Sequence, residues 1–395
     1  MRIIILFIVL LFFLGCSTRV TGTKTVYKVT PKETSQFIPF EEPKITIYKE
    51  DVEPVVTKIK IKKPTKAQKI YNKRVSYVRK KAAPYWGEKA EVASRYNYVK
   101  YEKDFKARTI INFENGVIRV ETTETNNSLG TLKEVIVSTL LNTQNPEDID
   151  LFSTRNKVHV GEPFLLNRVR DHDGKPVRWT WRANRYADYL IKTALKKDLI
   201  KTTAGSKKRY YVTFNMKQDA YSKTSELNYA SIVKDQAKRF GVNPALIFAL
   251  IETESHFNPY ATSGIPAYGL MQVVPNSAGR DAWMFLKNKK GKPTRNYLYN
   301  ARNNIEMGSA YMHILLNRYL SDIKNPNKRE LCAIAAYNTG SGNVLRSFHR
   351  NKDKAFSKIN KLSADALYKH LRTRLPYKET RDYVKKVTVA KKRYL

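Results

Sequence analysis

The stretch that most constrains this chain is Asn243–Arg280, which begins as an apolar helix and continues into a polar loop. Asn243 is a residue type that caps helices, and Pro244 suits the first helical position, where its missing N–H costs nothing. Every residue of Ala245–Ile251 is apolar, so the helix has no face suited to water. The stretch therefore predicts a helix that is buried nearly all round inside a folded domain.

Two carboxylates, Glu252 and Glu254, follow directly at the end of this helix. At about 100° per residue they point about 200° apart and cannot share one face. Each continues an apolar row of the helix, so periodicity does not choose between them. A carboxyl held at the end of an apolar helix loses hydration, which raises its pKa and lets it act as a general acid near neutral pH. The alternative is a solvated glutamate at a helix end, which is the commoner fate of a single glutamate.

The residues around and after Glu254 carry a family resemblance. The matching blocks are Glu254-Ser255 with Phe257-Asn258-Pro259, Gly269-Leu270-Met271-Gln272-Val273, Ala336-Tyr337-Asn338, and Leu375-Pro376 with Glu379-Thr380-Arg381 and Tyr383-Val384. In this order they resemble the soluble-type lytic transglycosylase domain, which has the goose-type lysozyme fold. In that family the glutamate directly before the serine is the catalytic acid, so the resemblance selects Glu254.

The resemblance also implies the other residues of the site. Tyr383 matches the tyrosine that faces the catalytic glutamate and orients it, and we count it as catalytic. The positions that match substrate-binding residues are Ser263, Met271, Gln272, Tyr337 and Asn338. For each polar residue except Glu254, a packing or capping role is the alternative, because loop residues often bond to the backbone. Glu379 and Arg381 are expected to form a structural ion pair.

Glycoside cleavage usually needs two carboxyl groups, yet no second catalytic carboxylate accompanies Glu254 in the matched motifs, since Glu379 is expected in the ion pair with Arg381. This fits the family, in which one glutamate makes both proton transfers and the substrate's N-acetyl group replaces the missing nucleophile. The resemblance thus implies a lytic transglycosylase, a lyase that cleaves the β-1,4 bond between N-acetylmuramic acid and N-acetylglucosamine in peptidoglycan and forms 1,6-anhydro ends. The alternatives are a hydrolytic muramidase of the same fold and a non-catalytic peptidoglycan-binding lipoprotein.

The N-terminus reads as an export signal. Ile3–Gly15 is an almost unbroken apolar run behind Arg2, too short for a spanning helix of about 20 residues and of the length found in secretory signals. It ends in Phe13-Leu14-Gly15-Cys16, which resembles a lipobox with Phe where Leu is usual. We expect residues 1–16 to be a lipoprotein signal peptide, with lipidated Cys16 anchoring the protein to the inner face of the outer membrane, in the periplasm. An ordinary signal peptide or short anchor is the alternative.

Residues 17–82 are interpreted as a basic, flexible tether, rich in Thr, Lys and Pro. The whole chain has 73 Lys and Arg against 35 Asp and Glu, a net charge of +38, which predicts a polyanionic neighbour. For an exported protein, peptidoglycan strands with their peptide carboxylates and the membrane surface are nearer partners than nucleic acid, which we do not expect. A merely solubilising charge is the alternative, and the sequence names no protein partner.

Residues 83–217 are predicted to form an α+β domain that tunes substrate engagement. The expected elements are a hairpin of Thr109–Phe113 and Val117–Glu121 around Asn115-Gly116, a helix Ser128–Leu141, a hairpin of Phe164–Arg170 and Val177–Trp181, a helix Arg182–Leu199 and a closing strand Tyr210–Phe214. Tyr85-Trp86-Gly87-Glu88, Glu162-Pro163-Phe164-Leu165 and Arg178-Trp179-Thr180-Trp181 make this part similar to the N-terminal domain of the membrane-bound lytic murein transglycosylase C family.

Residues 221–395 are predicted to be the mainly α-helical, lysozyme-like catalytic domain. Besides the helix of Glu254, helical spacing occurs in Leu227–Phe240, Asn304–Tyr319, Arg329–Tyr337 and Asp382–Lys392, with a surface loop at Lys287–Arg295. The fold class is thus an α+β N-terminal domain followed by a helical domain. The sequence shows no metal-ligand spacing, phosphate loop or nucleotide fingerprint, so we expect no metal and no cofactor.

Overall fold

The computed structural model describes residues 24–27, 47–50, 64–88, 90–143, 150–154, 161–216 and 223–395, with side chains for all except 24–27, 47–50 and 223–227. The chain divides into a short unit, residues 1–63, and a large one, residues 64–395. In the short unit β1 (Lys24–Tyr27) pairs antiparallel with β2 (Ile47–Glu50), within the stretch interpreted as a flexible tether. The predicted signal peptide and Cys16 lie outside the described residues. None of the described helices is long and apolar enough to cross a membrane.

The C-terminal part of the predicted tether is instead a helix, α1 (Lys66–Trp86). Thr65 and Gln68 form a capping box, in which each side chain bonds to the other's backbone N–H. Val78, Ala82 and Trp86 are buried at intervals of four residues and form the apolar stripe of the helix. The many lysines and arginines around this stripe hid it in the sequence. The folded part of the chain therefore begins before residue 83.

An antiparallel sheet forms the centre of the N-terminal region, by which we mean residues 64–216. Its strands are β3 (Asn97–Glu102), β4 (Ala107–Asn112), β5 (Val117–Thr122), β7 (Gly205–Asn215) and β6 (Lys196–Thr202), in this spatial order. The hairpin around Asn115-Gly116 is confirmed, with Gly116 at a φ of 71° and Ile111 opposite Ile118. The predicted strand Tyr210–Phe214 belongs to β7, which lies between β5 and β6 and does not close the sheet.

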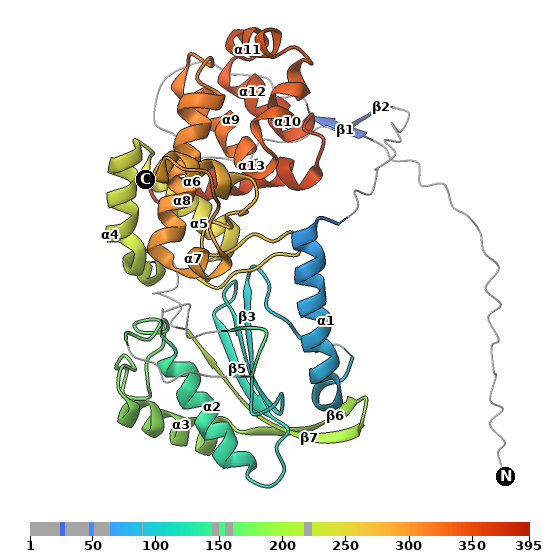
Figure 1. The fold of residues 1–395 in the computed structure, drawn as a ribbon, viewed down its shortest axis with the longest axis vertical. Coiled ribbons are helices and arrows are strands. Elements are labelled where there is room, and N and C mark those ends of the chain that lie inside the picture. Colours follow the sequence, from blue (N-terminus) through green and yellow to red (C-terminus); the bar gives the residue numbers. More distant parts are fainter. Residues whose placement is uncertain are drawn as a thin grey trace, which may run out of the picture. The chain divides into compact units, whose positions relative to one another are not determined.

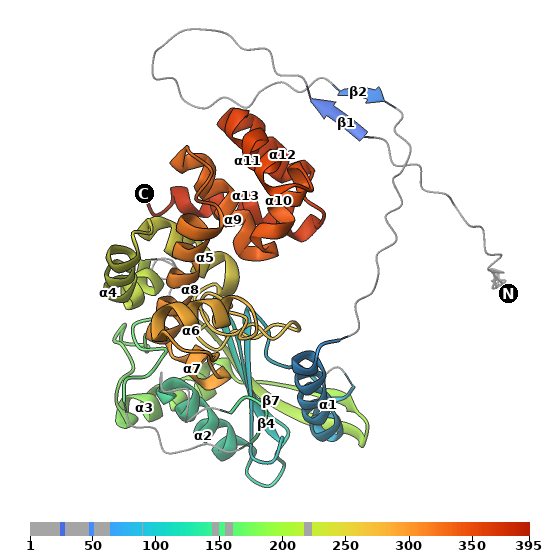
Figure 2. The ribbon, with the colours of Figure 1, turned by 45° about the horizontal axis from the view of Figure 1, so that its top comes forward.

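Helices cover both faces of this sheet (Figures 1 and 2). Helix α2 (Ser128–Leu141), found as predicted, and α3 (Thr180–Ala194) pack on one face, and α1 packs against the other. The prediction of a helix up to Leu199 is wrong, because the backbone becomes extended at Leu195 and enters β6. Of the predicted hairpin around Asp173-Gly174 only the turn is present, closed by a single antiparallel bridge between Arg170 and Pro176, and the two expected strands do not form. The Asp171 side chain accepts the N–H groups of the residues that follow and forms turns there.

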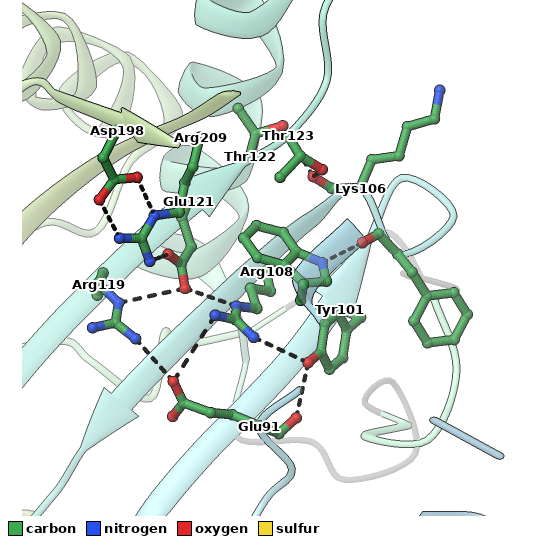
Figure 3. Close-up of polar contacts among 12 residues, drawn as sticks. Glu91, Tyr101, Lys106, Arg108, Arg119, Glu121, Thr122, Thr123, Asp198 and Arg209 are labelled. Atoms are coloured by element: carbon green, nitrogen blue, oxygen red, sulfur yellow. Dashed lines mark hydrogen bonds and ion pairs between the residues drawn. The ribbon is translucent and has the colours of Figure 1, made fainter. Parts of the chain in front are cut away.

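A buried charge network fastens α1 to the sheet (Figure 3). The fully buried Glu121 carboxylate accepts hydrogen bonds from Arg108 Nε at 2.7 Å and from Arg209 Nη1 at 2.8 Å. The Arg108 guanidinium lies over the Trp86 ring at 4.1 Å, and Trp86 Nε1 donates to the carbonyl of Phe105 at 2.6 Å. Removing one partner of such a buried pair typically costs about 3–5 kcal/mol, and Arg108 connects this pair to Trp86 of α1.

The helical region, residues 223–395, follows the predicted fold class. Its elements are α4 (Lys223–Phe240), α5 (Pro244–Ser255), α6 (Ala278–Lys287), α7 (Arg295–Tyr299), α8 (Ala301–Ile314), the π-helical turn η2 (Leu315–Tyr319), α9 (Pro326–Thr339), α10 (Ser341–Phe348), α11 (Lys352–Lys361), α12 (Ala364–Thr373) and α13 (Lys378–Lys392). Helix α5 lies within the main core of this region and packs against α13 and α4. The predicted buried helix is therefore confirmed.

The N-terminal and helical regions share a hydrophobic core. Tyr260 and Tyr299 of the helical region belong to the same buried cluster as Tyr98 and Phe164 of the N-terminal region. The Tyr260 ring lies 5.8 Å from that of Tyr98 and 5.7 Å from that of Phe164. The two regions are parts of one compact unit, and the contact between them, which we call the seam, shapes the site described next.

Candidate active site

Local sequence signals place Glu254 at the buried end of α5. The Asn243 side chain accepts the Ala245 N–H at 2.8 Å, and Pro244 is the first helical residue, as predicted. The helix ends where His256 adopts a left-handed conformation with a φ of 48°. The carboxyl group of Glu254 thus reaches the helix end with only 4% of the residue exposed to solvent.

The two carboxylates of α5 face different surroundings. Glu252 accepts hydrogen bonds from Arg393 and from the Tyr394 hydroxyl, the latter at 2.7 Å. It also lines a cavity of about 530 Å³ between α5, α13 and the N-terminal region. Because Glu252 has these partners at the end of α13, the structure favours Glu254 as the acid on independent grounds.

Burial raises the pKa of Glu254 to about 7. The charge of Arg95 and the Tyr383 hydroxyl hold this pKa down, while the carboxylate of Glu379 pushes it up. Tyr383 is itself buried beside Glu254, and its hydroxyl has no hydrogen bond of ordinary geometry to any described residue. Burial and the neighbouring carboxylate raise the pKa of Tyr383 well above its usual value, so this phenol remains a donor. A carboxyl of this kind can give up a proton and take one back near neutral pH.

Arg95, which sequence reasoning missed, brings a positive charge from the N-terminal region to the acid. Its guanidinium lies 3.6 Å from the Glu379 carboxylate, and its backbone carbonyl accepts a hydrogen bond from Asn258 Nδ2 at 3.1 Å. The next residue, Tyr96, donates its hydroxyl to the carbonyl of Thr253 at 3.2 Å. Arg95 is far from Glu254 in the sequence and outside every matched motif, so no signal pointed to it.

The expected ion pair between Glu379 and Arg381 is wrong. Glu379 pairs with Arg95 instead. Arg381 donates from its guanidinium to the backbone carbonyl of Leu375 at 2.5 Å, at the start of α13. The two side chains are close in sequence, but each has a nearer partner on another part of the chain.

Ser255 joins the catalytic helix to the loop that follows it. Its buried hydroxyl donates to the carbonyl of Leu270 at 2.8 Å and to that of Ile251 at 3.0 Å. Gly269 has a φ of 76°, and a Cβ there would lie 2.3 Å from the carbonyl oxygen of Leu298. Asn304 completes the loop, because its amide bonds the carbonyls of Tyr268 and Leu298 and accepts the N–H of Met271. The loop geometry thus explains why a serine follows Glu254 and why position 269 is a glycine.

Met271 and Gln272, two of the predicted substrate-binding residues, lie in this loop. The Met271 side chain is fully buried against Gly308, where an added Cβ would lie 2.4 Å from its sulfur. Gln272 has a φ of 46°, and its Nε2 donates to the carbonyls of Ala261 and Gly269 at 3.1 and 3.0 Å. Its buried Oε1 has no partner among the described residues. An unpaired buried acceptor of this kind needs a donor, such as an N–H of a ligand.

The other three predicted substrate-binding residues are distributed unevenly. Tyr337 lies near the acid, since the charge of Glu254 raises its pKa, and its hydroxyl donates to the Met271 carbonyl at 2.9 Å. Asn338 accepts the Thr380 hydroxyl at 2.6 Å and so connects α9 to α13. The Ser263 hydroxyl donates within its own turn to the carbonyl of Ile265. The structure therefore gathers Glu254, Tyr337, Tyr383 and Arg95, and gives Asn338 and Ser263 local bonds.

Comparisons with known proteins agree with this architecture. The family described as membrane-bound lytic murein transglycosylase C, N-terminal domain, matches residues 62–226, and the transglycosylase SLT domain matches residues 231–360. The first match includes α1, and Tyr383 lies beyond the second. Fold and site therefore define a transglycosylase SLT-domain protein with an N-terminal α+β region. The chain belongs to the membrane-bound lytic murein transglycosylase C family.

Individual relatives are similar over most of the chain. The membrane-bound lytic murein transglycosylases C of Serratia proteamaculans and Yersinia pestis are each 41% identical over 311 residues, which cover 78% of this chain and 85% of theirs. Among solved structures, the lytic transglycosylase Slt of Pseudomonas aeruginosa aligns with 26% identity and a TM-score of 0.34, covering 42% of this chain and 24% of that one.

Proposed function

We propose that this protein is a lipid-anchored lytic transglycosylase that cleaves the β-1,4 bond between N-acetylmuramic acid and N-acetylglucosamine in peptidoglycan and leaves 1,6-anhydro-N-acetylmuramic acid ends. The observation that carries the proposal is the buried Glu254 carboxyl, whose pKa of about 7 lies where one group can act as acid and then as base. The names of its relatives and its SLT domain support the same activity.

In the first step protonated Glu254 gives its proton to the bridging oxygen, and the bond from this oxygen to the anomeric carbon of N-acetylmuramic acid breaks. The N-acetyl group of that sugar meets the positive charge that develops at the anomeric carbon. We assign to Tyr383, whose unpaired hydroxyl lies beside Glu254, the role of orienting the carboxyl group, and to Arg95 that of stabilising the carboxylate that donation leaves behind.

In the second step the Glu254 carboxylate takes the proton of the C6 hydroxyl of the same sugar. The freed oxygen bonds to the anomeric carbon and closes the 1,6-anhydro ring, so Glu254 regains its proton and no water is consumed. Attack by a tethered hydroxyl has a large entropic advantage, with effective molarities that can reach about 10⁵ M or more. One carboxyl group is then sufficient for both steps.

Gln272 is the most clearly defined contact for the sugars. Its unpaired Oε1 suits the amide N–H of an N-acetyl group. Tyr337, on α9, lies near the acid and would form the wall of the site on that side. Met271, Asn338 and Ser263 complete the proposed substrate-binding set, of which Met271 would contribute through its backbone, because its side chain is buried.

We further propose that lipidated Cys16 anchors the protein to the inner face of the outer membrane, in the periplasm. The relatives are named membrane-bound, and the sequence around Cys16 resembles a lipobox. Several acyl chains on one residue anchor a protein stably. Cys16→Ala should abolish acyl labelling and release the protein from the membrane fraction while a soluble assay still detects activity. Acyl label retained on this variant would contradict the assignment.

A hydrolytic muramidase is the second candidate, and Glu379 is the observation that favours it. Its carboxylate is close enough to affect Glu254, and retaining glycosidases use two carboxyl groups about 5 Å apart. Glu379 is, however, 69% exposed and paired with Arg95, which suits it poorly for attack on a sugar.

Analysis of the digestion products distinguishes the candidates. Purified peptidoglycan is digested with the full-length protein and the released muropeptides are weighed by mass spectrometry. We expect ends that lack one water and resist borohydride reduction, and none from Glu254→Gln. Reducible, hydrated ends that disappear in Glu379→Gln would establish the muramidase, and binding without release would establish a non-catalytic protein.

A further inference from the structure

A second cavity, of about 210 Å³, lies between α1 and the helical region. Helix α1 contributes one wall with Ala67, Ile70, Tyr71 and Arg74, Phe152 forms the floor, and Tyr268 and Arg295 close the other side. We call it the Arg74–Arg295 pocket. None of the residues that line this pocket has a role in the proposed reaction.

The floor of the pocket is held in place. Lys100 on β3 donates from Nζ to the carbonyls of Asp150 and Ser153, both at 2.8 Å, which fixes the segment that carries Phe152. The Phe152 ring meets the Tyr71 ring edge-on at 6.2 Å. Because the segment is fixed on both sides of Phe152, the pocket is a built feature of the fold.

Two guanidinium groups converge on this floor. The Arg74 and Arg295 guanidinium carbons lie 5.7 and 5.5 Å from the centre of the Phe152 ring. Arg74 forms no ion pair with a described residue, and the carboxylate nearest to Arg295 is that of half-exposed Asp150, at 3.8 Å. Arg295 Nη1 is buried and has no hydrogen-bond partner in the described part of the chain. Since arginine stays charged in proteins and Asp150 offsets at most one of the two charges, the pocket keeps a net positive charge.

Two phenols add hydrogen-bond donors. The Tyr71 and Tyr268 hydroxyls are near enough to influence each other, and burial raises the pKa of both, so they keep their protons. The charges of both arginines oppose this rise in the pKa of Tyr268, and all four side chains line the same cavity. Guanidinium and phenol donors facing a small cavity are the groups that bind a carboxylate. Ala67 and half-exposed Ile70 provide an apolar wall beside them.

The pocket adjoins the proposed sugar-binding loop. Tyr268 directly precedes Gly269, and its backbone is bonded to Val273 and to the Asn304 side chain, which also holds Met271. A ligand group in the pocket would therefore lie beside a glycan strand bound along this loop. The volume of about 210 Å³ suits a terminal group of a peptide.

We propose that the Arg74–Arg295 pocket binds the C-terminal carboxylate of a peptidoglycan stem peptide. The two guanidinium groups and two phenols hold the carboxylate, and the apolar wall receives the methyl group of a terminal alanine. This inference rests on the proposed function, because it assumes a glycan strand with peptide stems as the substrate. Helix α1 would then help the protein to select strands that carry peptides over naked strands.

The test is calorimetric titration of the full-length protein with a stem tetrapeptide that ends in D-alanine. Arg74→Gln and Arg295→Gln should each weaken binding about tenfold or more, the effect of one charged hydrogen bond. A tetrapeptide with a C-terminal amide should lose affinity to the same degree. Arg74 lies on the exposed surface of α1, so its variant keeps the fold even if Arg295→Gln does not. Lys73→Gln, which removes a neighbouring charge of α1 outside the pocket, is the matched control and should bind like the wild type.

Three results would overturn the proposal. They are no measurable binding of the peptide to the wild type, wild-type affinity in both arginine variants, or equal affinity for the amidated peptide. In digests, the arginine variants should also lose about tenfold in preference, measured as kcat/KM for peptide-substituted strands relative to naked ones. If the protein cleaves neither substrate, the proposed function fails, whereas the peptide titration still decides the role of the pocket.

Discussion

Arg95 of the N-terminal region and Glu254 of the helical region interact across the seam, although each belongs to a different part of the sequence. Their interaction opposes the burial that raises the pKa of the acid. Asn258 fixes the backbone of Arg95, and Glu379 holds its guanidinium. The N-terminal region thus takes part in setting the pH range over which the proposed acid holds its proton.

Replacing Arg95 should therefore move the pH profile. Without the guanidinium, the pKa of Glu254 rises further, so the high-pH limb of kcat/KM in Arg95→Gln should shift upward by about one unit. Arg95→Lys should restore most of the wild-type profile, and Arg302→Gln, on an exposed position of α8, should leave it unchanged. The measurement is muropeptide release between pH 5 and 9. An unshifted limb in Arg95→Gln would show that this charge does not act on the acid.

Glu254→Gln should abolish activity and make the stability of the protein less dependent on pH. The pKa of Glu254 is raised from 4.5 to about 7 on folding, so the native state binds this proton more tightly than the unfolded chain. The protonated carboxyl group thus contributes to the free energy of unfolding. This contribution is fully present below about pH 4.5 and is lost as the pH rises to about 7, a change on the order of 3 kcal/mol. The amide variant has no carboxyl group to ionise and avoids this loss. Its free energy of unfolding, measured with denaturant, should therefore rise relative to that of the wild type between pH 5 and 8.

The control for this prediction is Glu252→Gln. It keeps most of the activity and loses about 1 kcal/mol, because its partners Arg393 and Tyr394 are at the partly exposed end of α13. Equal loss of activity in both glutamine variants would contradict the choice of Glu254.

Ser255→Ala should weaken both the fold and the reaction. The variant leaves the buried carbonyl of Leu270 without its donor, which costs about 1–3 kcal/mol and loosens the loop of Met271 and Gln272. Thr373→Ala removes a hydroxyl that makes the same bond to a preceding carbonyl on the exposed surface of α12, and it should be nearly neutral. Melting temperature and kcat are the measurements. A Ser255→Ala protein with wild-type kcat would mean that the loop holds its place without the hydroxyl.

Removing residues 83–217 should prevent stable folding. We expected from sequence that this part only tunes substrate engagement, but the deletion exposes Tyr260 and Tyr299, which are buried in the shared core, and removes Arg95. Circular dichroism of this deletion variant should show a broad, low-temperature transition, and the variant should be inactive. A cooperative transition at the wild-type temperature would show that the helical region folds alone.

Features with a local cause could be predicted from the sequence. Asn243 and Pro244 define the start of α5, and Asn115-Gly116 defines the first hairpin, because each signal acts within a few residues. Helix α1 was missed because its basic residues outnumber its apolar stripe, and β6 was missed because its pairing with β7 overrides the helical pattern before it. The motifs indicated Glu254, Tyr337 and Tyr383, whereas Arg95 and the Arg74–Arg295 pocket arise from contacts between distant segments that no local pattern encodes.

The seam has a further property that bears on how such proteins diverge. In the described part of the chain, four side chains that cross it donate hydrogen bonds to main-chain carbonyls: Tyr96 to Thr253, Arg168 to Phe257, Asn258 to Arg95 and Tyr260 to Thr143. Every amino acid has a carbonyl, so a substitution at an acceptor position leaves the bond intact and calls for no compensating change. These bonds therefore constrain the donor side chains and place no demand of their own on the side chains of the acceptor residues. For these four bonds, covariation between the two positions, the usual evolutionary trace of a contact, should therefore be weak, in contrast to side-chain pairs across the seam such as Arg95 and Glu379.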